Sequence, residues 1–476
     1  MGADHGHDDE AGSTSKPAAW ARRPPGVPAG VPPPSVPLGF LAAAAVGLIG
    51  CGVAFWWARA AGIPDPTADP VVAATHFGVL ATLAMGVLGA VHQFVPVITG
   101  RSLRSVRLAR ATLALWFGAA WMLPLGIATE QLAVTAVSGA LAGLAVVALA
   151  VNLAPALAVS GKGAPVTGLR YAVGAAVVTG FLGVLFVGNR QGHWFDPAGH
   201  VDLTMGVVGM FGWLGLSYVA VAEKLWPMFF LAHVPGRHRA GRFAVHLMAS
   251  GTALLAAGLG LEQDALAAAG ALVLAAGLGA HLTSLAIHVR HRRRRADLHL
   301  VFVLTSALWL VAGTGLAAAG AALIGSSPVT GAALVAAAGC AFGGWLLVTL
   351  VGHAHKVVPF IVWSALRSRG IATAPSGKPL LFADLYHHRW AVATYGATTA
   401  GVLGLCLGFA ASWSSAIAAG GWLLVVAGVL AAANLSIVPL RLLRSSATPA
   451  GAASGARAAT PGLARPPQMP VAPTGR

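Results

Sequence analysis

The chain has 476 residues, of which 57% are hydrophobic and only 9% are charged, and its formal net charge is +16 at pH 7. Soluble globular proteins carry about 25% charged residues, so this composition excludes a water-soluble fold. It also excludes a β-barrel, because barrel strands alternate apolar and polar residues and this chain has long apolar runs. We therefore expect an all-α integral membrane protein.

Polar segments flank the apolar part of the chain. Residues 1–35 are polar and then Pro-rich, and residues 444–476 are rich in Ala, Gly and Pro, so both predict disordered cytoplasmic tails. No apolar segment follows a short basic start, so the first tail is not predicted to be a signal peptide. Residues 36–443 form the predicted membrane domain, with twelve runs near the length of about 20 residues that a membrane helix needs. The runs are 37–58, 70–98, 107–128, 131–158, 168–189, 200–231, 242–262, 265–288, 299–324, 328–362, 388–411 and 414–441.

The loops between these runs differ in charge. Loops after even-numbered runs are rich in Arg and Lys, as in the run from Arg290 to Arg295, and the opposite loops carry acids such as Glu130 and Glu262. Positive loops stay in the cytoplasm, so we expect a multi-pass protein of a bacterial-type cytoplasmic membrane with both termini inside. Its expected surroundings are the lipid bilayer, and the basic charge is explained without nucleic acid. Histidines among these arginines, including His281, His288 and His299, are interpreted as interfacial.

An internal repeat runs through the membrane domain. Three similar segments, 92–96, 223–227 and 355–359, lie near the ends of runs 2, 6 and 10, and their prolines are 131 and 132 residues apart. Four runs fit each interval. The spacing therefore predicts twelve transmembrane helices arranged as three pseudo-threefold repeats of four, at 36–160, 168–289 and 299–443.

The repeated proline places one ionisable residue at the same level of each unit. Proline has no N–H and leaves the carbonyl four residues earlier without its helical partner; that carbonyl belongs to His92, Glu223 or His355. Two histidines and a carboxylate can hold a transition metal, and such a cluster can also relay protons. The alternative is that these residues cap kinked helix ends.

A second group of candidates lies toward the opposite side of the membrane. His76 opens the long apolar run 2, and His193 and His200 lie in a polar loop before run 6. Such loops can bind copper or zinc, or bring a haem ligand to the outer leaflet. An interfacial histidine and an ordinary polar loop are the alternatives.

Together these features resemble the catalytic subunit of the haem–copper oxidases, including the large subunit of the nitric oxide reductases. The resemblance rests on twelve helices, both termini inside, a pseudo-threefold arrangement of four-helix units, and His on the second, sixth and tenth helices. It implies that His76 is the haem ligand of the second helix, that His200 is near the copper ligand of the sixth, and that His353 and His355 are the His-x-His pair of the tenth. The family's His-His copper pair on the seventh helix has no counterpart, so the resemblance implies haem more strongly than copper.

The resemblance implies a redox role in electron transport, with a redox partner or a second respiratory subunit. Two other functions stay open. The chain can be a haem-free permease or metal handler that uses His92, Glu223 and His355 on kinked helices, or a structural subunit without a site of its own. The sequence does not decide whether the protein is an enzyme.

Overall fold

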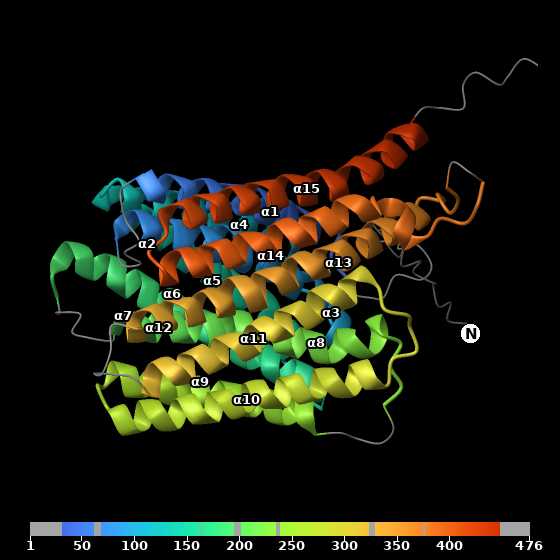
Figure 1. Ribbon diagram of the computed structural model, residues 1–476. Helices are drawn as coiled ribbons and strands as arrows, with labels where there is room; N and C mark the ends of the chain where they lie inside the picture. Colours follow the sequence, from blue (N-terminus) through green and yellow to red (C-terminus); the bar gives the residue numbers. More distant parts are fainter. Residues whose placement is uncertain are drawn as a thin grey trace, which may run out of the picture.

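A computed structural model describes residues 31–60, 68–161, 163–194, 201–234, 239–322, 329–374 and 377–447. These residues form a bundle of helices whose long axes are roughly aligned (Figure 1). Within these ranges the β pairing is limited to an isolated bridge between Thr373 and Pro379. Twelve helices are long and apolar enough to cross a membrane. The predicted all-α membrane class is therefore confirmed.

The spans follow the predicted runs closely. The first unit of sequence holds α1 (Ser35–Ala60), α2 (Asp69–His76), η2 (Phe77–Ala84), α3 (Met85–Thr99), α4 (Val106–Ala128) and α5 (Leu132–Leu157). The second holds α6 (Gly163–Gly192), α7 (Val201–Val207), η3 (Val208–Gly215), α8 (Leu216–Phe229), α9 (Ala240–Gly260) and α10 (Asp264–Arg290). The third holds α11 (Leu298–Ala322), α12 (Val329–Gly339), η4 (Cys340–Leu347), α13 (Val348–Arg367), the short η5 (Phe382–Leu385), α14 (His388–Ala410) and α15 (Ser414–Ala447).

The largest boundary differences are at α6 and α13. Helix α6 begins at Gly163 rather than near 168, because Pro165 is tolerated in the first turn of a helix. Helix α13 continues to Arg367 rather than stopping near 362. Much of both predicted tails, and the loop residue His200, lie outside the described residues.

The second, sixth and tenth spans share an interruption that the other spans do not show. Each contains a π-helical segment of 8 residues, a form that is rare and mostly limited to single turns in proteins. The segments begin at Phe77, Val208 and Cys340, which are 131 and 132 residues apart. Further along the same spans, the three repeated prolines lie inside the helices: Pro96, Pro227 and Pro359.

These three spans are also the most buried. Over an apolar 18-residue stretch of each span, the buried share of residues is 61%, 67% and 61% in spans 2, 6 and 10, and it ranges from 11% to 44% in the other nine. The outer helices expose large apolar side chains such as Phe181, Leu272 and Leu308, which suits contact with lipid. Spans 2, 6 and 10 are therefore called the inner helices.

Three hairpins have the same tight turn. In the α4–α5, α9–α10 and α14–α15 connections, one residue has a φ of 53°: Glu130, Glu262 and Ser412. The residue after it donates its N–H to the carbonyl of a glycine, over 2.9 Å to Gly126, 2.8 Å to Gly258 and 2.7 Å to Gly408. A Cβ on any of these glycines would collide with the next helix. We call this side of the bundle the hairpin end, and the Arg-rich side, with the loops 100–105, 291–297 and 368–387, the basic end.

Candidate functional site

A cavity of about 80 Å³ lies where the inner helices meet. Side chains at matching positions of the three helices line it, together with Pro37 and Leu41 of α1. The matching sets, again 131 and 132 residues apart, are Leu83, Leu214 and Leu346; Gly86, Ser217 and Thr349; Val87, Tyr218 and Leu350; Ala90, Val221 and His353; and Phe94, Leu225 and Val357. The three helices thus stand in register around the space, which we call the inner cavity.

The wall of the inner cavity is mostly apolar and includes a few polar side chains. Helix α8 contributes Ser217 and Tyr218, α13 contributes Thr349 and His353, and α3 contributes Gln93. Two of these side chains have a buried polar atom without a hydrogen-bond partner among the described residues, Ser217 Oγ and His353 Nε2, and the Thr349 hydroxyl lies beside that of Tyr218. A buried polar atom without a partner costs about 1–3 kcal/mol. A space of this size admits water-sized molecules.

His353 connects the wall of the inner cavity to a group of buried aromatic rings. Its ring centre lies 5.7 Å from that of Tyr218 and 4.8 Å from that of His299, edge to face in both cases. Tyr218 also meets His281 at 5.3 Å. His281 and His299 are only 2% and 5% exposed, so the interfacial interpretation of these two histidines was wrong. The i, i+3, i+7 spacing of His281, Ser284 and His288 was the available signal, because it places three polar residues on one buried face of α10.

His92 and His355 have closely similar surroundings in two different units. The Nδ1 of His92 bonds to the Leu88 carbonyl over 2.7 Å, and that of His355 bonds to the Val351 carbonyl over 2.9 Å. A carbonyl only accepts, so Nδ1 carries the proton in both rings. The Nε2 of each ring is buried and has no partner in the described part of the chain. An imidazole fixed in this way has its Nε2 lone pair available to a ligand.

Glu223 occupies the equivalent position of α8 but has different neighbours. Its carboxylate lies against Gly241 at the start of α9, and Ser284 of α10 is beside it. His92 stacks on Phe40 and His355 on Phe302, so the three predicted metal ligands have separate surroundings. Within the described ranges, no group of three or more His, Cys, Asp or Glu side chains is arranged to hold a metal ion.

His76 is far from His353 and His355, the two predicted haem ligands of α13. It ends α2, and its Nδ1 bonds to the Val72 carbonyl over 2.8 Å. The register of the inner helices puts His76 level with Gly339, 14 residues before His353. At 1.5 Å per residue that is about 20 Å along the helix axis. A haem iron held jointly by His76 and either His353 or His355 therefore does not fit this arrangement, and His200 lies outside the described residues.

No protein-family model matches the sequence, and no curated protein matches it.

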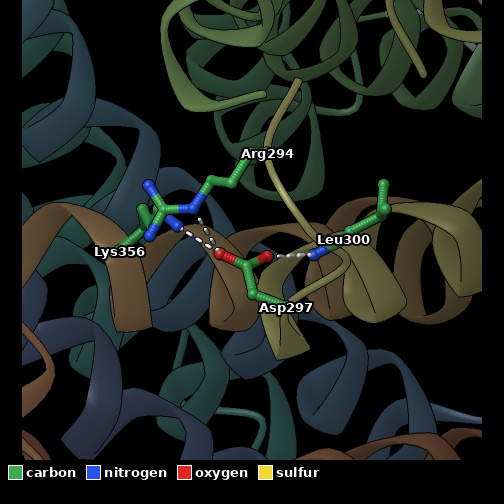
Figure 2. A network of polar contacts seen from close by, with 4 residues as sticks. All are labelled: Arg294, Asp297, Leu300 and Lys356. Carbon is green, nitrogen blue, oxygen red and sulfur yellow. Dashed lines mark hydrogen bonds and ion pairs between the residues drawn. The ribbon is translucent and has the colours of Figure 1, made fainter. Parts of the chain in front are cut away.

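A charged network joins the residues before α11 to Lys356 in the middle of α13, as Figure 2 shows. Lys356 Nζ contacts Asp297 Oδ2 at 2.5 Å, and Arg294 Nε is 3.4 Å from the same oxygen. The other carboxylate oxygen of Asp297 accepts the Leu300 N–H over 3.1 Å and so caps the start of α11. Burial raises the pKa of the nearby Tyr386 hydroxyl, and the Asp297 carboxylate raises it further. The network ties the loop 291–297 to an inner helix one residue away from His355.

Proposed function

We propose that the protein is a permease-type membrane protein and that its inner cavity binds a small polar solute. The observation that carries this proposal is the presence of Ser217 and His353 in the cavity wall, each with a polar atom that is buried without a partner in the described structure. An apolar cavity with a few convergent polar groups is the usual form of a small-molecule site. The cavity lies within a membrane-spanning bundle, so its solute would bind inside the membrane.

The inner helices have a second property expected of a transport pathway. Each is interrupted by a π-helical segment, and such interruptions are frequent at functional sites. Transporters bind their substrates near discontinuous helices at the interface of internal repeats. The leucines at 83, 214 and 346, which line one end of the cavity, lie within or beside these segments. A change of hydrogen-bond register there would alter the space around the solute.

The proposal includes a threefold origin of the bundle. The π-helical segments, the cavity-lining sets and the prolines share one spacing, and three hairpins share one turn. These regularities support three repeats of four helices, at 36–160, 168–289 and 299–443. They also support a distant relation to the haem–copper oxidase scaffold.

We further propose that the basic end faces the cytoplasm of a bacterial-type membrane. Arg101, Arg104, Arg292, Arg293 and Arg369 lie in the loops of that end, and positive residues in short loops are retained on the cytoplasmic side. The start of α1 and the end of α15 would then both face the cytoplasm, in line with the predicted orientation of the termini.

Cysteine accessibility tests the cavity directly. In a background with Cys51, Cys340 and Cys406 replaced by Ala, Thr349→Cys is treated with a small, water-soluble methanethiosulfonate. The matched control is Ser306→Cys, which is 1% exposed and bonds to the Val303 carbonyl away from the cavity. We expect labelling at 349 and none at 306. Equal protection of both thiols in folded protein would reject a solute-accessible cavity.

A haem-dependent redox role is the second candidate. It is favoured by the buried Nε2 atoms of His92 and His355, each on a ring whose Nδ1 is held by a backbone carbonyl. A bound haem would supply electron transfer, with a redox partner or second subunit as the donor. A reduced-minus-oxidised absorption spectrum of the purified protein tests it. Haem bands lost in His355→Ala would favour the redox role, and a colourless folded sample would reject it.

A further inference from the structure

The inner cavity has no acidic or permanently charged side chain in its wall. Among the described residues that line it, none is Asp, Glu, Lys or Arg, and the polar ones are Gln93, Ser217, Tyr218, Thr349 and His353. An ion in an apolar interior is costly unless an opposite charge accompanies it. The composition of the wall therefore favours an uncharged solute.

The charged side chains that the inner helices carry near this level are turned elsewhere. Lys356 of α13 contacts Asp297, just before α11, at 2.5 Å. Glu223 of α8 lies against Gly241 at the start of α9. Residues two apart on a helix point about 200° apart, so Glu223 is directed away from Val221, which lines the cavity. Neither charge is placed to compensate an ionic solute in the inner cavity.

The two unpaired polar atoms of the wall are complementary to each other in hydrogen bonding. His353 Nδ1 bonds to the Thr349 carbonyl over 2.9 Å, and a carbonyl only accepts, so Nδ1 carries the proton. His353 Nε2 has no partner among the described residues, so its lone pair is available to an N–H or O–H donor. Ser217 Oγ is also unpaired in the described structure and carries a hydrogen that it can donate. The wall thus offers one acceptor and one donor.

The spacing of these two side chains suits a short molecule. Ser217 is level with Thr349, and His353 follows four residues later on α13. At 1.5 Å per residue the offset along the helix axis is about 6 Å, and each hydrogen bond spans about 2.9 Å. The cavity volume of about 80 Å³ corresponds to roughly five to eight water-sized groups. A solute of a few heavy atoms, with a donor at one end and an acceptor at the other, fits both measures.

Resting on the proposed permease function, we propose that the inner cavity selects small uncharged solutes that both donate and accept hydrogen bonds, of the class of short-chain amides. His353 Nε2 accepts the N–H of the solute, and the Ser217 hydroxyl donates to its carbonyl oxygen. Ions of the same size are excluded because the wall supplies no compensating charge.

The test is solute entry into proteoliposomes of the full-length protein, followed by stopped-flow light scattering at a membrane potential clamped with potassium and valinomycin. Protein-free liposomes are the blank. Urea and guanidinium are the matched probes, because both are small and planar and only guanidinium is charged. We expect saturable entry of urea and no entry of guanidinium above the blank.

Competition against urea entry tests the need for a donor. Propionamide and N,N-dimethylformamide are isomers, and only propionamide has N–H groups. We expect propionamide to inhibit urea entry and N,N-dimethylformamide to leave it unchanged. Both comparisons use the wild-type protein, so they do not depend on the folding of a variant.

Two substitutions test the assigned contacts. Ser217→Ala and His353→Leu each remove one hydrogen bond, so the urea concentration for half-maximal entry should rise roughly fivefold in each. The control is Ser306→Ala, because Ser306 is 1% exposed and bonds to the Val303 carbonyl; it should keep wild-type entry. An unchanged half-maximal concentration in both cavity variants would overturn the assignment.

Three results with the wild type would also overturn the proposal: equal entry of urea and guanidinium, equal inhibition by the two isomers, or no urea entry above the blank. Thiol labelling of Thr349→Cys separates this failure from that of the proposed function. Labelling together with any of these results rejects the solute class and leaves an accessible cavity. Absence of labelling rejects the solute-accessible cavity itself.

Discussion

The ring of Phe40 stacks on that of His92, with centres 5.1 Å apart and planes inclined by 17°. The same arrangement recurs between α11 and α13, where Phe302 stacks on His355 at 6.0 Å and 18°. In each case a glycine three residues before the histidine leaves room for the phenylalanine, namely Gly89 for Phe40 and Gly352 for Phe302. A Cβ at Gly89 would lie 2.7 Å from Phe40 Cβ. A Cβ at Gly352 would lie closer still to Phe302 Cβ.

These contacts predict that Gly352→Ala destabilises the protein. The methyl group must displace Phe302, whose ring is 0% exposed, and overpacking of a core typically costs about 1–3 kcal/mol. The measurement is the free energy of unfolding in a detergent titration. The control is Gly279→Ala in α10, where an added Cβ meets nothing within 4 Å. Because Ala favours helix over Gly by up to about 1 kcal/mol, this control is expected to be neutral or stabilising. A Gly352→Ala protein as stable as the Gly279→Ala protein would contradict the packing described here.

A hydrogen bond to a π-helical segment makes a second prediction. Trp116 Nε1 donates to the Leu80 carbonyl of η2 over 3.0 Å. Trp116→Phe keeps an aromatic ring and removes the donor, so stability should fall by about 1 kcal/mol. Trp422→Phe serves as the comparison, since Trp422 is half exposed and packs against Trp56. Similar losses in both variants would show that the hydrogen bond to η2 contributes nothing measurable.

The network in Figure 2 predicts coupling between Lys356 and Asp297. The side chains are 18% and 33% exposed, so solvent screening limits the pair to about 1 kcal/mol. A double-mutant cycle with Lys356→Met and Asp297→Asn isolates this energy, because Asn still caps α11 well. We expect the sum of the stability losses in the two single mutants to exceed the stability loss in the double mutant. Additive losses would mean that the contact carries no coupling.

Much of the fold was predictable from the sequence, because lipid imposes long apolar helices and positive loops on any such chain. All twelve spans appear, and most boundaries are within a few residues. The prolines at 96, 227 and 359 also identified the three helices that prove to be the most buried. The π-helical segments were not predictable, because FGVLATLA, VGMFGWLG and CAFGGWLL share no local pattern that distinguishes them from ordinary helix.

The candidate site was predictable only in part. His353 was singled out and does line the inner cavity, but Ser217 and Thr349 were missed because hydroxyl residues are common in membrane helices and carry little signal alone. Glu223 was grouped with His92 and His355 because all three precede a proline by four residues. A shared level along parallel helices does not fix a shared direction, and Glu223 faces α9 and α10 instead.

The most direct test of the central claim is hydroxyl-radical labelling of the wild-type protein in a microsecond radiolysis pulse, read by mass spectrometry. Water next to a buried side chain allows its oxidation. Tyr218 lines the inner cavity, and Tyr395 is the control, because its hydroxyl bonds to Thr305 over 2.8 Å away from the cavity. If the inner cavity admits water and polar solutes, Tyr218 will be oxidised well above Tyr395. Protection of Tyr218 to the level of Tyr395 or below would contradict a solute site between the inner helices.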